Sequence, residues 1–177
     1  MIKVTLKDGS VKEYAKGTTV MDIAKSISEG LARSIVAASV NGEVVGLNYE
    51  VNEDCELSLF KFEDEEGKDV FRHTSAHMLA QAIKRLYPDA KFAIGPSIDN
   101  GFYYDIDLEH RLTAEDLVKL EAEMKKIAKE DATIERFELS KEDALAWAKE
   151  NGEIYKTELI EELPEGEVIS FYKQGEF

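Results

Sequence analysis

The sequence opens with MIKVTLKDGSVKEYAKGTTVMDIAKSI (residues 1–27), and this stretch decides the fold of the first part of the chain. Apolar and polar residues alternate over 2–6, Asp8-Gly9 is a common turn dipeptide, and a second alternating run follows at 11–15. This pattern predicts a β-hairpin. Apolar residues then recur at helical spacing over 20–27, which predicts a helix directly after the hairpin.

Further extended segments are expected beyond that helix, after Gly30, which is the type of residue at which a chain leaves a helix. They are the apolar run 35–40, the short Val44-Val45 and the alternation at 57–59. The order strand, strand, helix, strand, strand suits a small sheet with one face covered by a single helix. The pattern resembles a ubiquitin-like β-grasp domain.

The acidic run EDEEGKD (63–69) contains no large apolar residue and predicts a linker. The expected division is therefore a first domain over 1–62, the linker over 63–69, and a second domain over 70–177. The second domain is predicted to be α+β, with a helix from about Val70 to Leu86 stopped by Pro88. Its other expected elements are strands at 91–94, 102–106, 134–139 and 168–173, and helices starting at Thr113 and Ser140.

Composition excludes several functional classes. The 22 basic and 37 acidic residues give a net charge of −15, so nucleic acid is not expected to bind through bulk positive charge. A single cysteine, Cys55, excludes an internal disulfide framework. No run approaches the roughly 20 apolar residues of a membrane span, and no signal peptide precedes the first strand. We expect a cytoplasmic protein with no membrane partner.

His73 and His77 are candidate catalytic residues because positions i and i+4 share one face of a helix. Lys84 lies on the same face, and the expected apolar stripe (Phe71, Met78, Leu79, Ala82, Leu86) lies opposite. A zinc protease would need Glu after the first histidine, where this chain has Thr74. No metal site is expected, since Cys55 and His110 lack useful spacing. The remaining interpretations are a general base acting on water and two ordinary surface histidines.

Two other segments could complete a site. Lys156 is a candidate cation for a developing oxyanion, although most lysines are solvated charges. The loop GPSIDNG (95–101), with Asp99 in it, precedes Tyr104. Its glycines permit close backbone approach, so the loop is either a pocket wall or a tight hairpin with one core aromatic.

Taken together, RHTSAHMLA (72–80), AIGP (93–96) and DNGFYYD (99–105), after a β-grasp module, resemble the amino-terminal region of bacterial threonyl-tRNA synthetases. The resemblance covers essentially the whole chain. It implies a TGS domain followed by an editing domain that hydrolyses serine wrongly esterified to threonine tRNA. It also implies His73, His77 and Lys156 as catalytic residues, and Gly95, Asp99 and Tyr104 as substrate-binding residues.

The resemblance further implies a parent enzyme that charges threonine tRNA with ATP, magnesium and zinc in a separate catalytic domain, and that is a homodimer through other domains. No cofactor is expected in this segment. In the family, the strand that here ends at Phe177 continues into a C-x-x-x-H element facing the histidine pair. We therefore expect a truncated editing domain that neither ligates nor edits efficiently. A free-standing zinc-dependent aminoacyl-tRNA hydrolase and a non-catalytic RNA-binding or regulatory module remain alternatives.

Overall fold

The computed structural model describes residues 1–177 and contains two compact units, Met1–Thr74 and Ser75–Phe177. The division falls inside one long helix, α3 (Glu65–Leu86). No helix combines the length and the apolar character that crossing a membrane requires.

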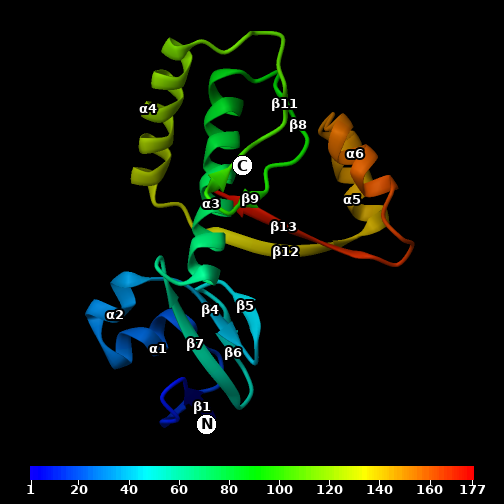
Figure 1. Ribbon diagram of the computed structural model, residues 1–177. Helices are drawn as coiled ribbons and strands as arrows, with labels where there is room; N and C mark the ends of the chain where they lie inside the picture. The colour runs from blue at the N-terminus through cyan, green and yellow to red at the C-terminus, as the bar shows by residue number, and fades with distance from the viewer. The chain divides into compact units, whose positions relative to one another are not determined.

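The first unit is built on a five-stranded sheet in the order β2-β1-β7-β4-β5. The central strand β7 runs parallel to β1, and all the other neighbours are antiparallel. Helices α1 and α2 lie on one face of this sheet (Figure 1). The bounds are β1 Ile2–Leu6, β2 Val11–Tyr14, β3 Thr18–Thr19, α1 Val20–Ile27, α2 Glu29–Ser34, β4 Ile35–Val40, β5 Glu43–Val45, β6 Glu50–Val51 and β7 Cys55–Lys61.

Helix α1 forms the core of this unit with the sheet. Val20 and Ile23 on the helix pack with Val4 from β1 and Leu57 from β7, and all four side chains are almost fully buried. The Thr19 hydroxyl caps α1 by accepting a hydrogen bond from the Asp22 amide at 3.2 Å. The prediction of an α+β chain that starts with a β-grasp domain is confirmed.

The predicted helix end at Gly30 was wrong, because Gly30 lies inside α2. The chain leaves α1 at Ser28, whose amide still bonds to the Ala24 carbonyl while its hydroxyl caps α2 by accepting from the Leu31 amide. Ser28 thus ends one helix and starts the next. The sequence pattern pointed instead to Gly30 as the helix end, because glycine is common at that position.

Helix α3 begins at Glu65, five residues before the predicted start at Val70. Asp64 provides the reason: its carboxylate accepts from the Lys61 amide and its carbonyl accepts from the Lys68 amide. Acidic residues are also favourable in a first helical turn, where they face the positive end of the helix dipole. Most of the acidic run therefore belongs to the helix, and the boundaries 1–62, 63–69 and 70–177 stay a prediction.

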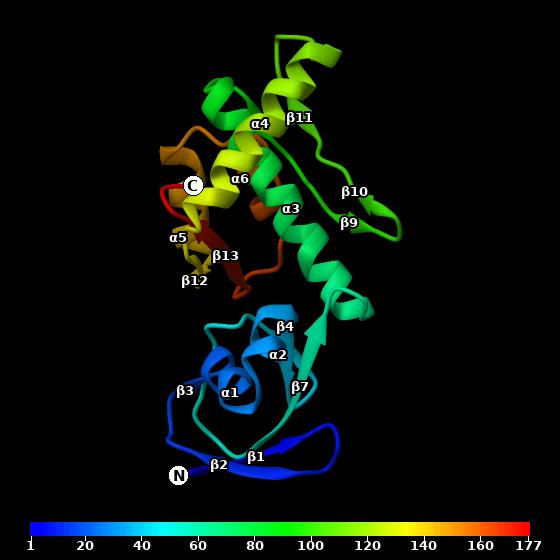
Figure 2. The ribbon, with the colours of Figure 1, turned by 90° about the vertical axis from the view of Figure 1, so that its left-hand side faces the viewer.

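The second unit contains the rest of α3, a small β region, helix α4 beside α3, and the helix pair α5 and α6 next to a two-stranded ribbon of β12 and β13 (Figures 1 and 2). The bounds are β8 Lys91–Phe92, β9 Ser97–Ile98, β10 Gly101–Phe102, β11 Ile106–Asp107, α4 Ala114–Glu130, β12 Ile134–Ser140, α5 Lys141–Glu150, α6 Ile154–Glu161 and β13 Val168–Gln174.

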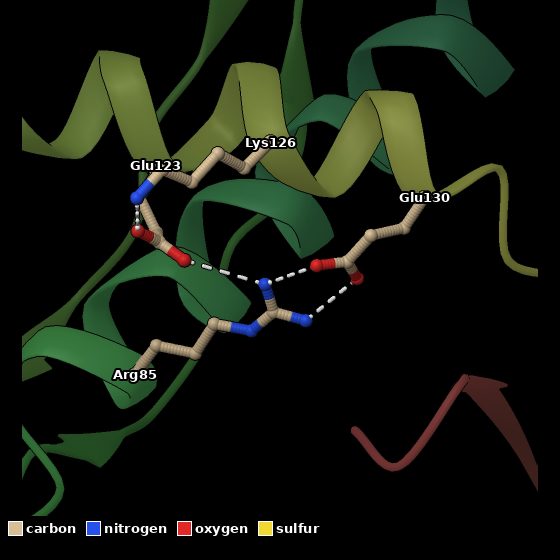
Figure 3. Close-up of polar contacts among 4 residues, drawn as sticks. All are labelled: Arg85, Glu123, Lys126 and Glu130. Atoms are coloured by element: carbon tan, nitrogen blue, oxygen red, sulfur yellow. Dashed lines mark hydrogen bonds and ion pairs between the residues drawn. The ribbon is translucent and has the colours of Figure 1, made fainter.

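Apolar packing and an ion-pair network join α3 to α4. Ile83 packs with Leu120 and Ile127 in the main core of this unit. Figure 3 shows the Arg85 guanidinium bound to both oxygens of Glu130 at 2.8 Å and to Glu123 at 3.3 Å. The hydrogen bond to Glu130 is the main cause of a raised pKa for Arg85, so the guanidinium stays charged.

A second, smaller core lies between the α5–α6 pair and the ribbon, where Ala144, Ala148 and Ile160 are buried beside Trp147 and Phe171. Helix α6 was not predicted from the sequence. Its first residues follow Glu153, whose side chain makes no capping hydrogen bond. The usual start signal of a helix is therefore absent there.

Candidate functional site

Helix α3 carries both candidate histidines, one turn apart. The His77 side chain is half-buried, and the edge of its ring meets the Phe177 ring with centroids 5.0 Å apart. His73 is exposed and lies just before the division between the two units. Of the predicted catalytic pair, His77 therefore belongs to the second unit and contacts Phe177 there.

The predicted apolar stripe of α3 was partly wrong. Phe71 and Leu86 are 50% and 37% exposed, whereas Ala76, Ala80 and Ile83 are almost fully buried. The buried face of this helix therefore consists of alanines and Ile83.

Gly95 and Tyr104 lie opposite each other in an interrupted hairpin. The β8–β11 ladder pairs Phe92 with Ile106, the β9–β10 ladder pairs Ile98 with Gly101, and the stretch around Gly95 lies between the two ladders. The long strands predicted over 91–94 and 102–106 are therefore reduced to these two short ladders.

The Tyr104 ring packs directly on Gly95. A Cβ atom at Gly95 would lie 2.3 Å from Cδ2 of that ring, so only glycine fits this position without movement. The ring also meets Phe92 edge-on at 5.6 Å. Burial, followed by the nearby negative charge of Glu153, raises the pKa of the Tyr104 hydroxyl. Asp99 lies in the exposed turn between β9 and β10.

Lys156 lies half-buried on α6, with Nζ 5.5 Å from the centroid of the Trp147 ring. Burial lowers the pKa of Lys156, the charge of Glu153 acts in the opposite direction, and Lys84 lowers it further. The predicted cation is thus part of a charged group that also contains Lys84 and Glu153.

Lys84 connects this charged group to the aromatic residues. Its Nζ donates to the Ala90 carbonyl at 3.1 Å, lies 3.7 Å from Glu153 Oε1 and lies 5.8 Å from the Phe92 ring centroid. Phe92 in turn contacts Tyr104 and, at 6.4 Å, Phe177. We call the resulting set of residues the Phe92 cluster: His77, Lys84, Phe92, Tyr104, Glu153, Lys156 and Phe177.

Sequence reasoning missed Glu153 and Phe177 as members of the cluster. Helical spacing did indicate Lys84, because it lies on the same face of α3 as the histidines, two turns after His77. No sequence pattern indicated Glu153, since it is one of 37 acidic residues and its contact with Lys84 joins segments far apart in the chain.

The Phe92 cluster contains the groups that ester hydrolysis requires. A neutral imidazole can take a proton from water, and a lysine ammonium or a tyrosine hydroxyl can stabilise a developing oxyanion. No group of three or more His, Cys, Asp or Glu side chains has an arrangement that could hold a metal ion. Cys55 is buried in the first unit, and burial raises the pKa of its thiol.

Comparison with known proteins agrees with the fold of the first unit. Residues 2–61 match the family model of the TGS domain. Residues 2–61 are a TGS domain. The matched residues run from β1 to the end of β7 and so include the whole five-stranded sheet of the first unit.

Over its whole length the chain is similar to one end of bacterial threonine–tRNA ligases. It is 73% identical over 177 residues to that of Clostridioides difficile, 60% identical to that of Acetivibrio thermocellus and 59% identical to that of Desulforamulus reducens. Each match covers 100% of this chain and 28% of the relative, so the chain spans just over a quarter of the relatives' length. The match is to their amino-terminal part, which confirms the resemblance expected from the sequence. The roles of His73, His77, Lys156, Gly95, Asp99 and Tyr104 stay a prediction.

Proposed function

We propose that this chain is the amino-terminal part of a threonine–tRNA ligase and that its second unit hydrolyses serine esterified by mistake to threonine tRNA. The observation that carries the proposal is the Phe92 cluster: the partly buried Tyr104 ring meets Phe92, the half-buried His77 meets Phe177, which also meets Phe92, and the half-buried Lys156 lies on α6, which packs against β8. The 73% identity to a named threonine–tRNA ligase supports the choice of tRNA.

Such an activity has a physical reason in any enzyme that charges threonine. Serine lacks one methyl group of threonine, and a binding pocket gains only about 1–3 kcal/mol from one such group. Serine therefore cannot be excluded at the synthetic site by binding alone. Hydrolysis of the wrong ester at a second site corrects the error.

In the proposed reaction, the histidine pair orients a water molecule and His77 takes one of its protons. The water oxygen attacks the ester carbonyl carbon, and the ammonium of Lys156 balances the charge that develops on the carbonyl oxygen. The bond between the carbonyl carbon and the ribose oxygen then breaks. The ribose oxygen receives the proton from the imidazole, and serine leaves.

Gly95 and Tyr104 form one wall of the substrate pocket in this proposal, with Asp99 at its margin. The partner is the 3′-terminal adenosine of threonine tRNA carrying serine, and the hydrolysis uses no cofactor. ATP, magnesium and zinc act in the ligation reaction of the whole enzyme, which we propose to be a cytoplasmic homodimer.

A chimera tests this function. The chain replaces the corresponding segment of the Clostridioides difficile relative, which is feasible because the two are 73% identical over 177 residues. We expect the chimera to release serine from serine-charged threonine tRNA and to leave threonine-charged tRNA intact. Replacing His73 and His77 by Ala should abolish serine release and leave ligation unchanged.

The same experiment separates the alternatives. Hydrolysis by the isolated chain that disappears with a chelator and returns with zinc would support a zinc hydrolase. Retention of tRNA with no hydrolysis in either protein would support a binding module. Either result would contradict the proposed editing function.

A further inference from the structure

Lys84 joins three elements of the second unit through its ammonium group. The residue lies on α3, and its Nζ donates to the carbonyl of Ala90, directly before β8, at 3.1 Å. The same Nζ lies 5.8 Å from the centroid of the Phe92 ring in β8 and 3.7 Å from Oε1 of Glu153. The first two contacts hold the ammonium at β8, so it presents a fixed positive charge to Glu153.

Glu153 is the residue at which the chain passes from α5 to α6. Its amide donates to the Ala148 carbonyl of α5 at 2.9 Å, and its carbonyl accepts from the Thr157 amide of α6 at 2.9 Å. The backbone of Glu153 therefore connects the two helices. Its side chain makes no capping hydrogen bond and reaches Lys84 of α3 instead.

The carboxylate of this ion pair is shielded from water. Glu153 is 7% exposed, and its second oxygen, Oε2, is buried and makes no hydrogen bond. Lys84 provides the only ion pair that the structure gives to this carboxylate. A buried carboxylate left without its cation is costly, whereas exposed pairs are screened by water and salt. Breaking this pair therefore costs more than breaking the exposed pair of Lys149 with Glu161, 3.8 Å apart on the same two helices.

A second polar contact holds α6, but not to α3. The Tyr155 hydroxyl donates to Asp107 Oδ2 at 2.6 Å and so joins α6 to β11. In Figure 1 the β8–β11 ladder lies between α3 and α6. His77 lies on α3 and Lys156 lies in the first turn of α6, so the ion pair connects the two helices that carry these side chains.

We propose that Lys84 is a positioning residue, whose ion pair with Glu153 holds α6, and with it Lys156, in a fixed place relative to His77. The inference rests on the proposed function for the catalytic roles of His77 and Lys156. The connection between α3 and α6 rests on the contacts of Lys84 and Glu153 alone.

Amide hydrogen exchange in the 177-residue chain tests the connection without reference to catalysis. The Thr157 amide reports on the first turn of α6, because it donates to the Glu153 carbonyl. Lys84→Met, which removes the charge and keeps a long side chain, should accelerate this exchange at least about tenfold. Lys149→Met, which removes the exposed pair with Glu161, is the matched control and should leave the exchange unchanged.

The amide of Leu117 separates a local effect from loss of the fold. It donates to the Thr113 carbonyl in the first turn of α4, a helix that carries neither residue of the ion pair. Its exchange in Lys84→Met should stay as in wild type. Equal acceleration at Leu117 and Thr157 would mean general unfolding and would overturn the proposal, as would an unchanged rate at Thr157.

Serine release by the chimera gives the catalytic readout. Lys84→Met should lower kcat at least about tenfold and leave KM nearly unchanged, because Lys156 acts on charge that develops in the transition state. In a Lys156→Met background, Lys84→Met should cause no further loss, since its effect acts through Lys156. A second loss of the same size in that background would contradict the positioning role, and so would an unchanged kcat in Lys84→Met alone.

The two measurements separate this inference from the proposed function. If exchange at Thr157 responds as expected but the wild-type chimera releases no serine, the proposed function fails and the connection between α3 and α6 stands. If serine is released but Lys84→Met changes neither the exchange nor kcat, the positioning role fails and the function stands.

Discussion

Gly95→Ala tests the packing on which the proposed pocket wall depends. The new Cβ would lie 2.3 and 2.4 Å from two carbons of the Tyr104 ring, where an ordinary contact is 3.4 Å or more. The ring would therefore have to move by roughly 1 Å. Phe92, which is almost fully buried, lies against that ring and resists the movement.

Overpacking of this kind costs about 1–3 kcal/mol, and a loss of about 2 kcal/mol lowers the Tm of a domain of about 100 residues by about 8–16 °C. The only tryptophan, Trp147, lies in the second unit, so its fluorescence reports unfolding of that unit.

A double-mutant cycle makes the reasoning refutable. In a Tyr104→Ala background the ring is gone, so Gly95→Ala should no longer lower the Tm. An equal loss of stability with and without the ring would mean that the clash with Tyr104 is not the cause. A Tm of Gly95→Ala within about 1 °C of wild type would contradict the predicted overpacking directly.

Three other changes give sharp expectations. Gly67→Ala places a Cβ 1.9 Å from the Lys61 carbonyl oxygen, which is backbone, so amide hydrogen exchange in β7 should accelerate; unchanged exchange would contradict the contact. Arg85→Gln should cost about 0.5–1 kcal/mol in urea unfolding at low salt and less at about 0.5 M salt, whereas a loss that does not depend on salt would exclude an ion-pair origin. The hydrogen bond from His110, and then those from Thr113, lower the pKa of Asp116 in the folded state, so its stabilisation is present above the unfolded pKa of about 4 and is lost as the pH falls below it. Asp116→Asn should therefore be less stable than wild type at pH 7 and lose less stability between about pH 4 and pH 2, and an equal acid loss in both proteins would refute this linkage.

The β-grasp fold of the first unit could be predicted because its first strand alternates, its turns have typical residues and its core helix carries a cap. The errors occurred where one local signal had two meanings. Gly30 is typical of a helix end but lies inside α2, since Ser28 caps that helix. The start of α3 was placed at Val70 instead of Glu65, because acidic residues are typical of a linker and also suit the first turn of a helix.

The candidate site was predictable where its residues interact locally. Gly95 and Tyr104 face each other across one hairpin, and the loop sequence indicated a hairpin with an aromatic residue and a close backbone approach at glycine, although not which ring packs on Gly95. The pairing of Glu153 with Lys84 was not predictable, because it joins the start of α6 to α3 and no periodicity encodes a contact between distant segments. Helix α6 itself lacks a capping side chain, so the position of Lys156 on a helix was also missed.

Serine release from serine-charged threonine tRNA is the measurement that tests the account most directly. The chimera with the Clostridioides difficile relative is compared with its His73→Ala/His77→Ala variant, and ligation of threonine is the control for intact folding. We expect the chimera to hydrolyse the seryl ester at least about 100-fold faster than the variant, the usual scale for removal of a general base. Equal rates in the two proteins would contradict the editing function proposed for this chain.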